Sequence, residues 1–329
     1  MPRLPSWCRD AVLLDSTAPI AIDRPFSAKA ADRAGVPAGV RSALVDRGLL
    51  RPVLRGVFVA SQVPDSFRLR VAAVKLVVPP HMIVVDRTAA WVHGVDALPR
   101  RAIHEMPSLD LFSREGSRMR REGVTSGVRT LTPRDIEVVD ELTLTTQLRT
   151  ACDLGRTLWR YDALGALDGF VRIGLDRDHL LDEGSRFKGH RGVRQLRELA
   201  PLSDPGAESQ PESALRLHWY DAGIPAVPET QIWEYADDGS PLFRIDVGAR
   251  EVRYGAECFG EEFHAEDDEE SDDARLAWLE QARSWSMDVF TKDDVYGLDL
   301  MAGVRLARGF AEARAALGIR RTTYIDLAR

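Results

Sequence analysis

The chain has 329 residues, of which 44% are hydrophobic and 29% are charged, and its formal net charge at pH 7 is −7. This length accommodates two or three domains, and the negative charge excludes a nucleic-acid surface spread over the whole chain. Cys8, Cys152 and Cys258 are far apart in the sequence, which argues against a zinc site and a disulfide framework. Because the sequence has neither a signal-peptide pattern nor an apolar run of about 18 residues, we expect a cytoplasmic protein that does not span a membrane.

The first pattern along the chain is that of a small DNA-binding domain. A short helix is expected to end at Gly35, and Pro37 opens a second helix that stops before Gly48. Two short strands, 49–54 and 57–60, follow as a hairpin. Helix, tight turn, helix and β-hairpin is the order of elements in a winged helix-turn-helix.

In that fold the second helix enters the major groove of DNA. Arg41 and Ser42 are expected on the side of this helix that faces away from the core, so we predict that they contact base edges. The positions of Arg47, Arg51 and Arg55 suit contacts with phosphates. The alternative is a small helical cap whose arginine side chains are merely solvated.

Three segments resemble a known family: RGLLRPVLRGVFVAS at 47–61, RTAAWVHGVDALP at 87–99 and LTTQLRTACDLGR at 144–156. They are similar to segments of the AbiEi-type antitoxins, in which the first one forms the wing. The resemblance implies DNA binding, often at the protein's own promoter, and a cognate toxin protein as partner. Within these segments, His93 is expected to cap a helix or lie in a core, and Asp153 is expected to be structural.

Residues 62–200 are predicted to form an α+β middle domain. Strands are expected at 108–112, 128–131 and 136–142, followed by a helix over 145–158. The connection between the first two strands is the most basic local run of the chain: Arg114, Arg118, Arg120 and Arg121. This run is expected either to lie along a nucleic-acid backbone or to be a solvated loop that the acidic C-terminal half balances.

A linker at 201–206, rich in proline, separates the C-terminal domain from the preceding residues. The next helix starts behind Ser209 and Glu212. Glu212 is either part of a capping box with Ser209 or a third acid beside Asp246 and Glu257. A strongly acidic stretch, 261–273, is expected to be a solvated loop ahead of two further helices and a strand.

The segment 243–264 is predicted to be a β-hairpin with acids on its polar face. Apolar and polar residues alternate along both strands, and Asp246 and Glu257 belong to the polar set. If the turn is centred between Glu251 and Val252, the two acids lie opposite each other, with Cβ atoms about 5 Å apart, and can share a metal. A turn centred two residues earlier separates them by about 13 Å.

The order of elements in this domain, with acids on the hairpin, resembles the PD-(D/E)XK superfamily, specifically proteins related to the very-short-patch-repair endonucleases. The matching positions lie within 211–296: Glu212, Asp246, Glu257, Gly260, His264, Leu279, Val289–Lys292 and Val295. The resemblance implies that Asp246 and Glu257 hold Mg²⁺, which activates water for phosphodiester hydrolysis. It also implies a catalytic contribution from His264, as an acid or base, and from Glu212.

This chain departs from that family at one position of the site. Where the family has a lysine or an acid two residues after the glutamate, this chain has Phe259, which can neither bind a metal nor exchange a proton. Cys258, between the two, is a soft ligand that suits Mg²⁺ poorly, and Lys292 is the only lysine of the domain. The departure favours a domain that has lost hydrolysis and still binds DNA or a partner.

The sequence therefore predicts an α/β protein in three parts: a winged helix-turn-helix at 1–61, the α+β domain at 62–200 and a restriction-endonuclease-like domain at 207–329. The leading hypothesis is a DNA-binding regulator of the toxin–antitoxin or phage-defence type with a degenerate nuclease-like domain. One alternative is a Mg²⁺-dependent DNA endonuclease that uses Asp246 and Glu257. Another is an interaction module whose acidic segment neutralises a toxin.

Overall fold

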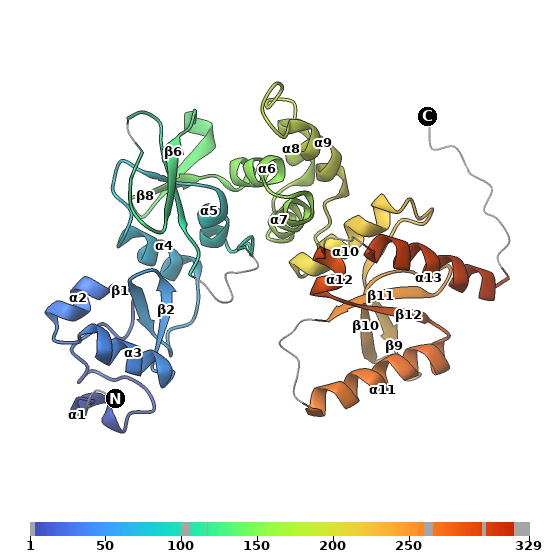
Figure 1. Cartoon of the computed structure of the whole chain (residues 1–329), viewed down its shortest axis with the longest axis horizontal. Coiled ribbons are helices and arrows are strands. Elements are labelled where there is room, and N and C mark those ends of the chain that lie inside the picture. Colours follow the sequence, from blue (N-terminus) through green and yellow to red (C-terminus); the bar gives the residue numbers. More distant parts are fainter. Residues whose placement is uncertain (1–3, 100–105, 117, 260–265, 298–300, 319–329) are drawn as a thin grey trace. The chain divides into compact units, whose positions relative to one another are not determined.

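The computed structural model describes residues 4–99, 106–116, 118–259, 266–297 and 301–318 (Figure 1). The chain divides into two compact units, Met1–Leu154 (unit 1) and Gly155–Arg329 (unit 2). Both combine helices with β-sheet, which confirms the predicted α/β class. The division falls inside helix α6 (Gln147–Thr157), so the helices that follow α6 belong to unit 2 and not, as predicted, to a middle domain at 62–200.

The N-terminal part of unit 1 contains the predicted helix, turn, helix and hairpin, together with a short strand that was not predicted. Its elements are α1 (Ser6–Arg9), β1 (Phe26–Ser27), α2 (Ala28–Arg33), α3 (Ala38–Asp46), β2 (Leu50–Leu54) and β3 (Val57–Ala60). Ser27 starts α2 by accepting a hydrogen bond from the Ala30 N–H at 3.2 Å. Gly35 and Gly48, with φ of 78° and 69°, permit the turns that end α2 and α3.

The hairpin β2–β3 shares a hydrophobic core with the rest of unit 1. Leu54 and Val57, which flank its turn, are buried in one cluster with Leu111 and Leu144 of the neighbouring sheet. Because one core spans both parts, the segment 1–61 is continuous with the residues after it and is not a separate compact unit.

A five-stranded sheet forms the remainder of unit 1, in the order β6-β5-β4-β8-β7. The elements are α4 (Phe67–Lys75), β4 (Ile83–Val84), α5 (Asp86–His93), β5 (Leu109–Ser113), β6 (Val124–Val128), β7 (Ile136–Val139) and β8 (Leu142–Thr145). The strand expected at 128–131 was misplaced, because the pairing with β5 selects the preceding residues. The single strand expected at 136–142 is a hairpin instead, since Asp140 and Glu141 both adopt positive φ and reverse the chain.

Unit 2 begins with helices, α7 (Arg160–Arg172), α8 (Arg177–Glu183), α9 (Val193–Leu199) and α10 (Gln210–Asp221), of which α8 was not predicted. A fully buried ion pair at 2.7 Å joins Arg216 of α10 to Asp168 of α7. Asp168 also accepts the main-chain N–H of Asp204 at 2.8 Å, so the predicted linker 201–206 is held against the helices. These contacts explain why α7 to α9 belong with the C-terminal sheet.

A four-stranded sheet in the order β12-β11-β10-β9 lies at the centre of unit 2 (Figure 1). Its elements are β9 (Glu229–Tyr235), β10 (Pro241–Ala249), β11 (Tyr254–Phe259), α11 (Glu266–Arg283), β12 (Ser286–Thr291), α12 (Lys292–Tyr296) and α13 (Ala302–Ala316). Trp219 of α10 contacts Tyr254 and Phe310 on one face of the sheet. On the other face, Leu279 of α11 is buried with Ile245.

The acidic stretch 261–273 is not simply the solvated loop that was expected. From Glu266 onward its backbone forms the first turns of α11. Acidic residues are favoured at the beginning of a helix because the N-terminal end carries partial positive charge. Across the parts of the chain that the structure describes, no helix has the length and apolar character that a membrane crossing requires.

Candidate functional site

The pairing of β10 with β11 brings the two predicted acids to the same level of the sheet. Val247 pairs with Ala256, and the next pair in this register is Asp246 with Glu257. Of the two registers that the sequence allowed, the structure therefore has the one that places these acids opposite each other.

Asp246 lies where the regular strand pairing is interrupted. The ladder between β9 and β10 includes Ile245 and Val247 but skips Asp246. Across this gap, Gln231 has a φ of 52°, in the left-handed region that side-chain-bearing residues seldom adopt. The main-chain N–H of Cys258 donates to Asp246 Oδ2 at 3.1 Å. The carboxylate thus supplies an acceptor at a point where the strand pairing stops.

Glu212 reaches the same region from the first turn of α10. The Ser209 hydroxyl caps the helix by accepting the Glu212 N–H at 3.3 Å, which is one half of the predicted capping box, while the Glu212 carboxylate accepts a different main-chain N–H. The Glu212 carboxylate accepts the side-chain amide of Gln231 at 2.7 Å and the main-chain N–H of Glu208 at 3.0 Å. Glu212 therefore both follows the cap and adds negative charge near Asp246, as the two interpretations of the sequence allowed.

Glu257 is buried, with 2% of its surface exposed, although it was expected on a polar face. Arg275 of α11 covers it: Nη1 donates to Oε1 at 2.9 Å and Nη2 donates to Oε2, in a two-pronged ion pair. Arg275 was not predicted from the sequence, because this residue follows the acidic stretch, 18 residues after Glu257, and no motif surrounds it.

The electrostatics of the cluster follow from burial and like charge. The pKa of the Asp246 carboxyl is raised to about 7. Burial is the largest cause, and the negative charges of the neighbouring Glu212 and Glu257 carboxylates add to it. Burial, followed by Asp246 and Glu212, also raises the pKa of the Cys258 thiol to about 12. Near neutral pH the Asp246 carboxyl is therefore present in both protonation states, while Cys258 stays a neutral thiol.

A lysine lies closer to this cluster than its sequence position suggests. The parallel strands β11 and β12 pair Phe259 with Thr291, so Lys292 follows beside the end of β11. Its charge acts to lower the pKa of Cys258, against the larger effect of burial. The side chain of Phe259 and the whole of His264 lie outside the described residues, so the predicted catalytic role of His264 stays a prediction.

The shared Mg²⁺ stays a prediction, and in this arrangement it would require Arg275 to release Glu257. Both carboxylate oxygens of Glu257 accept hydrogen bonds from Arg275, and one oxygen of Asp246 accepts the Cys258 N–H. Within the described part of the chain, no group of three or more His, Cys, Asp or Glu side chains is placed to hold a metal ion. The Arg275 guanidinium supplies the positive charge next to Glu257.

In unit 1, the prediction for Arg41 was wrong. Its side chain is buried, with 7% of the residue exposed. Nη1 donates to the main-chain oxygens of Val36 at 2.7 Å and Ala28 at 3.4 Å, and it pairs with Asp32 of α2. The guanidinium thus ties α3 to α2 and does not reach a base edge.

The other residues predicted to contact DNA are exposed to different degrees. Ser42 is exposed on α3. Arg47 and Arg51 donate to main-chain carbonyl oxygens of neighbouring segments, at 2.7 Å and 3.1 Å respectively. Arg55, at the turn of the β2–β3 hairpin, has 58% of its side chain exposed and pairs with exposed Glu122 at 2.7 Å. Arg55 is therefore the most available cation of this set.

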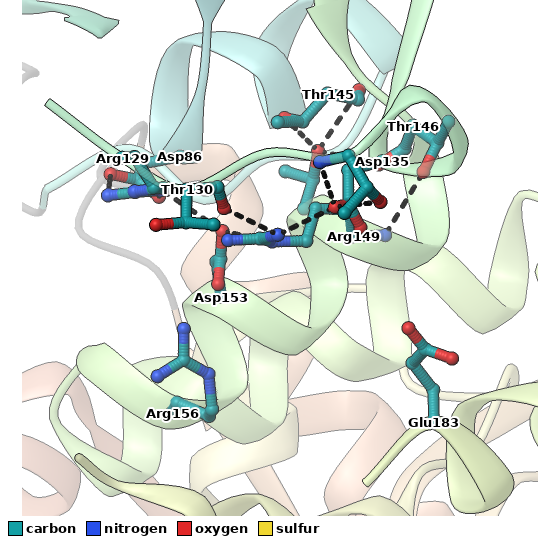
Figure 2. A network of polar contacts seen from close by, with 12 residues as sticks. Asp86, Arg129, Thr130, Asp135, Thr145, Thr146, Arg149, Asp153, Arg156 and Glu183 are labelled. Atoms are coloured by element: carbon teal, nitrogen blue, oxygen red, sulfur yellow. Dashed lines mark hydrogen bonds and ion pairs between the residues drawn. The ribbon is translucent and has the colours of Figure 1, made fainter. Parts of the chain in front are cut away.

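A second polar cluster joins the sheet of unit 1 to helix α6 (Figure 2). Arg129 pairs with Asp86 at 2.6 Å and with Asp153 at 3.0 Å. Arg149 pairs with Asp153 at 2.8 Å and with Asp135 at 3.2 Å. Each acid has an arginine partner, so the cluster is structural, which is the role expected for Asp153.

Two further groups of unit 1 have shifted pKa values. Burial lowers the pKa of His93, whose Nε2 lies 2.8 Å from the Thr145 oxygen, and this agrees with the core position expected for His93. Burial, and then the nearby Asp86 carboxylate, raise the pKa of Asp110 to about 6. Asp110 accepts the main-chain N–H of Arg87 at 3.1 Å, at the start of α5.

The fold and these two clusters define a multi-domain α/β protein that combines a helix-pair-and-hairpin segment with a second sheet that bears an acidic cluster. No family model matches the sequence. The chain is 32% identical over 280 residues to each of two proteins of Mycobacterium tuberculosis, the uncharacterized proteins Rv2248 (strain H37Rv) and MT2308 (strain CDC 1551). The match covers 82% of this chain and 95% of each relative, and the chain belongs to the family of these proteins.

Proposed function

We propose that this protein is a DNA-binding regulator of the toxin–antitoxin or phage-defence type, with a nuclease-like second unit that no longer cleaves DNA. The observation that carries the proposal is the helix pair α2–α3 followed by the β2–β3 hairpin, whose turn exposes Arg55. An exposed ion pair such as Arg55–Glu122 contributes only about 0–1 kcal/mol, so this guanidinium can exchange its carboxylate partner for a phosphate.

The exposed side of α3 limits what this helix contributes to recognition. The positions concerned are Ala38, Gly39, Ser42 and Asp46, none of which is a cation. Asp46 repels a phosphate, so Ser42 is the uncharged side chain of this set that can make a hydrogen bond to a base edge. We therefore assign most of the affinity to cations of the hairpin and its surroundings, and little sequence discrimination to α3.

The ion pair between Arg275 and Glu257 supports the loss of cleavage. An acid that a guanidinium holds by both oxygens is a poor metal ligand, because the metal must first displace a buried ion pair. In the same cluster, Asp246 has a pKa near 7 and so carries only part of its charge at neutral pH.

A metal-dependent endonuclease is the second candidate. The register that sets Asp246 opposite Glu257, with Glu212 near them, favours it. Lys292 adds a positive charge close to the cluster. This function requires Arg275 to release Glu257 when DNA and metal bind.

One electrophoretic experiment separates the two candidates. Purified protein is mixed with a supercoiled plasmid and with a labelled fragment of its own upstream region, in the presence and absence of Mg²⁺ or Mn²⁺. Asp246→Ala removes an acid of the cluster. Glu251→Ala, which removes an exposed acid from the turn of the same hairpin, is the matched control.

The proposal predicts a shift of the fragment without metal and no nicking by any variant. Metal-dependent nicking that Glu251→Ala keeps and Asp246→Ala loses establishes the endonuclease instead. Absence of a shift on both DNAs, at low salt, refutes DNA binding.

A further inference from the structure

The connection between β5 and β6 has an unusual course. These strands are neighbours and run parallel, with Leu109 paired to Val124. A parallel pair requires a crossover, so residues 114–123 must return from the end of β5 to the beginning of β6 over one face of the sheet. This crossover carries the basic run of the sequence: Arg114, Arg118, Arg120 and Arg121.

The crossover is anchored to the core at its middle. Met119 packs against the hydrophobic cluster that also contains Leu54 and Val57 of the hairpin. The Met119 carbonyl oxygen accepts the Ser126 hydroxyl at 2.7 Å. Anchoring at this position fixes the backbone on either side, where the neighbouring arginines lie exposed.

Four arginines lie close together along the crossover, and one of them, Arg121, donates a hydrogen bond to the Val77 carbonyl oxygen at 3.4 Å. All four are exposed. Among the residues that the structure describes, Arg114, Arg118 and Arg120 take part in no side-chain hydrogen bond and no ion pair. In a chain with a net charge of −7, a cluster of unpaired cations on an anchored segment is a local positive surface.

This surface continues into the turn of the β2–β3 hairpin. Glu122, at the end of the crossover, pairs with Arg55 at 2.7 Å. A Cβ atom at the next residue, Gly123, would lie 3.2 Å from the Arg55 side chain, so the two segments are in contact. Arg55 therefore lies beside the end of the crossover, next to Glu122 and Gly123 and close in sequence to Arg120 and Arg121.

We infer that Arg114, Arg118, Arg120 and Arg121 form a second set of phosphate contacts, so that the backbone of one DNA duplex lies along both the hairpin turn and the crossover. The inference rests on the proposed function and names a part of its interface that lies outside the helix pair and the hairpin. Phosphate contacts of this kind add affinity and salt dependence without reading sequence. They also supply the cations that the exposed side of α3 lacks.

The test measures DNA affinity by fluorescence anisotropy over a series of salt concentrations. Arg118→Ala/Arg120→Ala removes the two arginines beside the Met119 anchor. Arg191→Ala/Arg194→Ala, which removes two exposed arginines of unit 2, is the charge-matched control. Arg118→Lys/Arg120→Lys keeps the charge, and circular dichroism verifies that each variant is folded.

The crossover double variant is expected to bind about tenfold more weakly, and its slope of log K against log salt is expected to fall in magnitude by about 2, one for each lost phosphate contact. The preference for the upstream fragment over unrelated DNA should stay unchanged. The lysine variant should keep the slope, and the control should behave like the wild type.

If the crossover double variant binds DNA with the affinity of the wild type and an unchanged salt slope, this inference is overturned and the proposed function stands. An equal loss in the unit 2 control also overturns it, because the effect is then one of total charge. Failure of the wild type to bind DNA refutes the proposed function and this inference together.

Discussion

The two units hold buried carboxylates in opposite ways. In unit 1, Asp86, Asp135 and Asp153 share two arginine partners, Arg129 and Arg149, at distances between 2.6 and 3.2 Å (Figure 2). Each of the three acids contacts at least one of the two arginines, although acids outnumber cations in this network too. Such a network fixes the position of α6 against the sheet.

In unit 2 the acids outnumber the cations that hold them. Arg275 pairs with Glu257, while Asp246 has the carboxylates of Glu212 and Glu257 as electrostatic neighbours and a pKa near 7. A buried acid among acids lowers stability, so an arrangement of this kind is characteristic of a binding or catalytic site, present or ancestral. What distinguishes the two clusters is direct pairing: each acid of the unit 1 network contacts an arginine, whereas Asp246 accepts only a main-chain N–H in the described contacts.

The largest effect is expected from breaking the unit 1 network. Arg149→Ala leaves Asp135 and Asp153 buried with less positive charge, and the free energy of unfolding should fall by about 4 kcal/mol, the usual result of removing one partner of a buried pair. Urea denaturation measures this change. Arg114→Ala, at an exposed arginine, should change stability by less than about 0.5 kcal/mol. Similar small effects in both variants would show that the network is not structural.

The next effect concerns Arg275, the cation that covers Glu257 in the unit 2 cluster. Arg275→Ala should lower the free energy of unfolding by about 3 kcal/mol at pH 8, because Glu257 is then buried without its guanidinium. Thermal unfolding at this pH, with Mg²⁺ or with a chelator, measures this. A wild-type protein that Mg²⁺ stabilises would contradict the view that Arg275 makes Glu257 a poor metal ligand.

The smallest expected effect is a gain in the free energy of unfolding, and its size depends on pH. The folded-state pKa of Asp246, about 7, lies above the unfolded value of about 3.9, so the wild type loses stability as pH rises from about 4 to 7. Asp246→Asn removes this loss and should stabilise the protein by about 2 kcal/mol at pH 8 and not at pH 4. Asp110→Asn in unit 1 should also stabilise the protein at high pH, but by a smaller amount, because the pKa of Asp110 is about 6. Denaturation at several pH values tests both; a flat difference across pH would refute the shifted pKa.

Local patterns were sufficient to predict most elements of this protein. Ser27, Gly35 and Gly48 bracket the first helices as their conformational preferences require. Alternation of apolar residues located β10 and β11, and the position of the turn left only two registers, of which the structure has one. The reversal at Asp140 and Glu141 was missed because Glu141, unlike Asp140, is a residue type that seldom adopts positive φ, and no glycine marks the turn.

The ion-pair partners of charged residues could not be predicted from the sequence, because they come from segments that are distant along the chain. The sequence by itself determined the α/β class, the helix pair with its hairpin, and the set of acids around Asp246. Only the tertiary structure decided that Arg41 is buried between α2 and α3, and that Arg275 covers Glu257. The physical reason is the same in both cases: periodicity shows which face of an element is polar, while burial and pairing depend on what packs against that face.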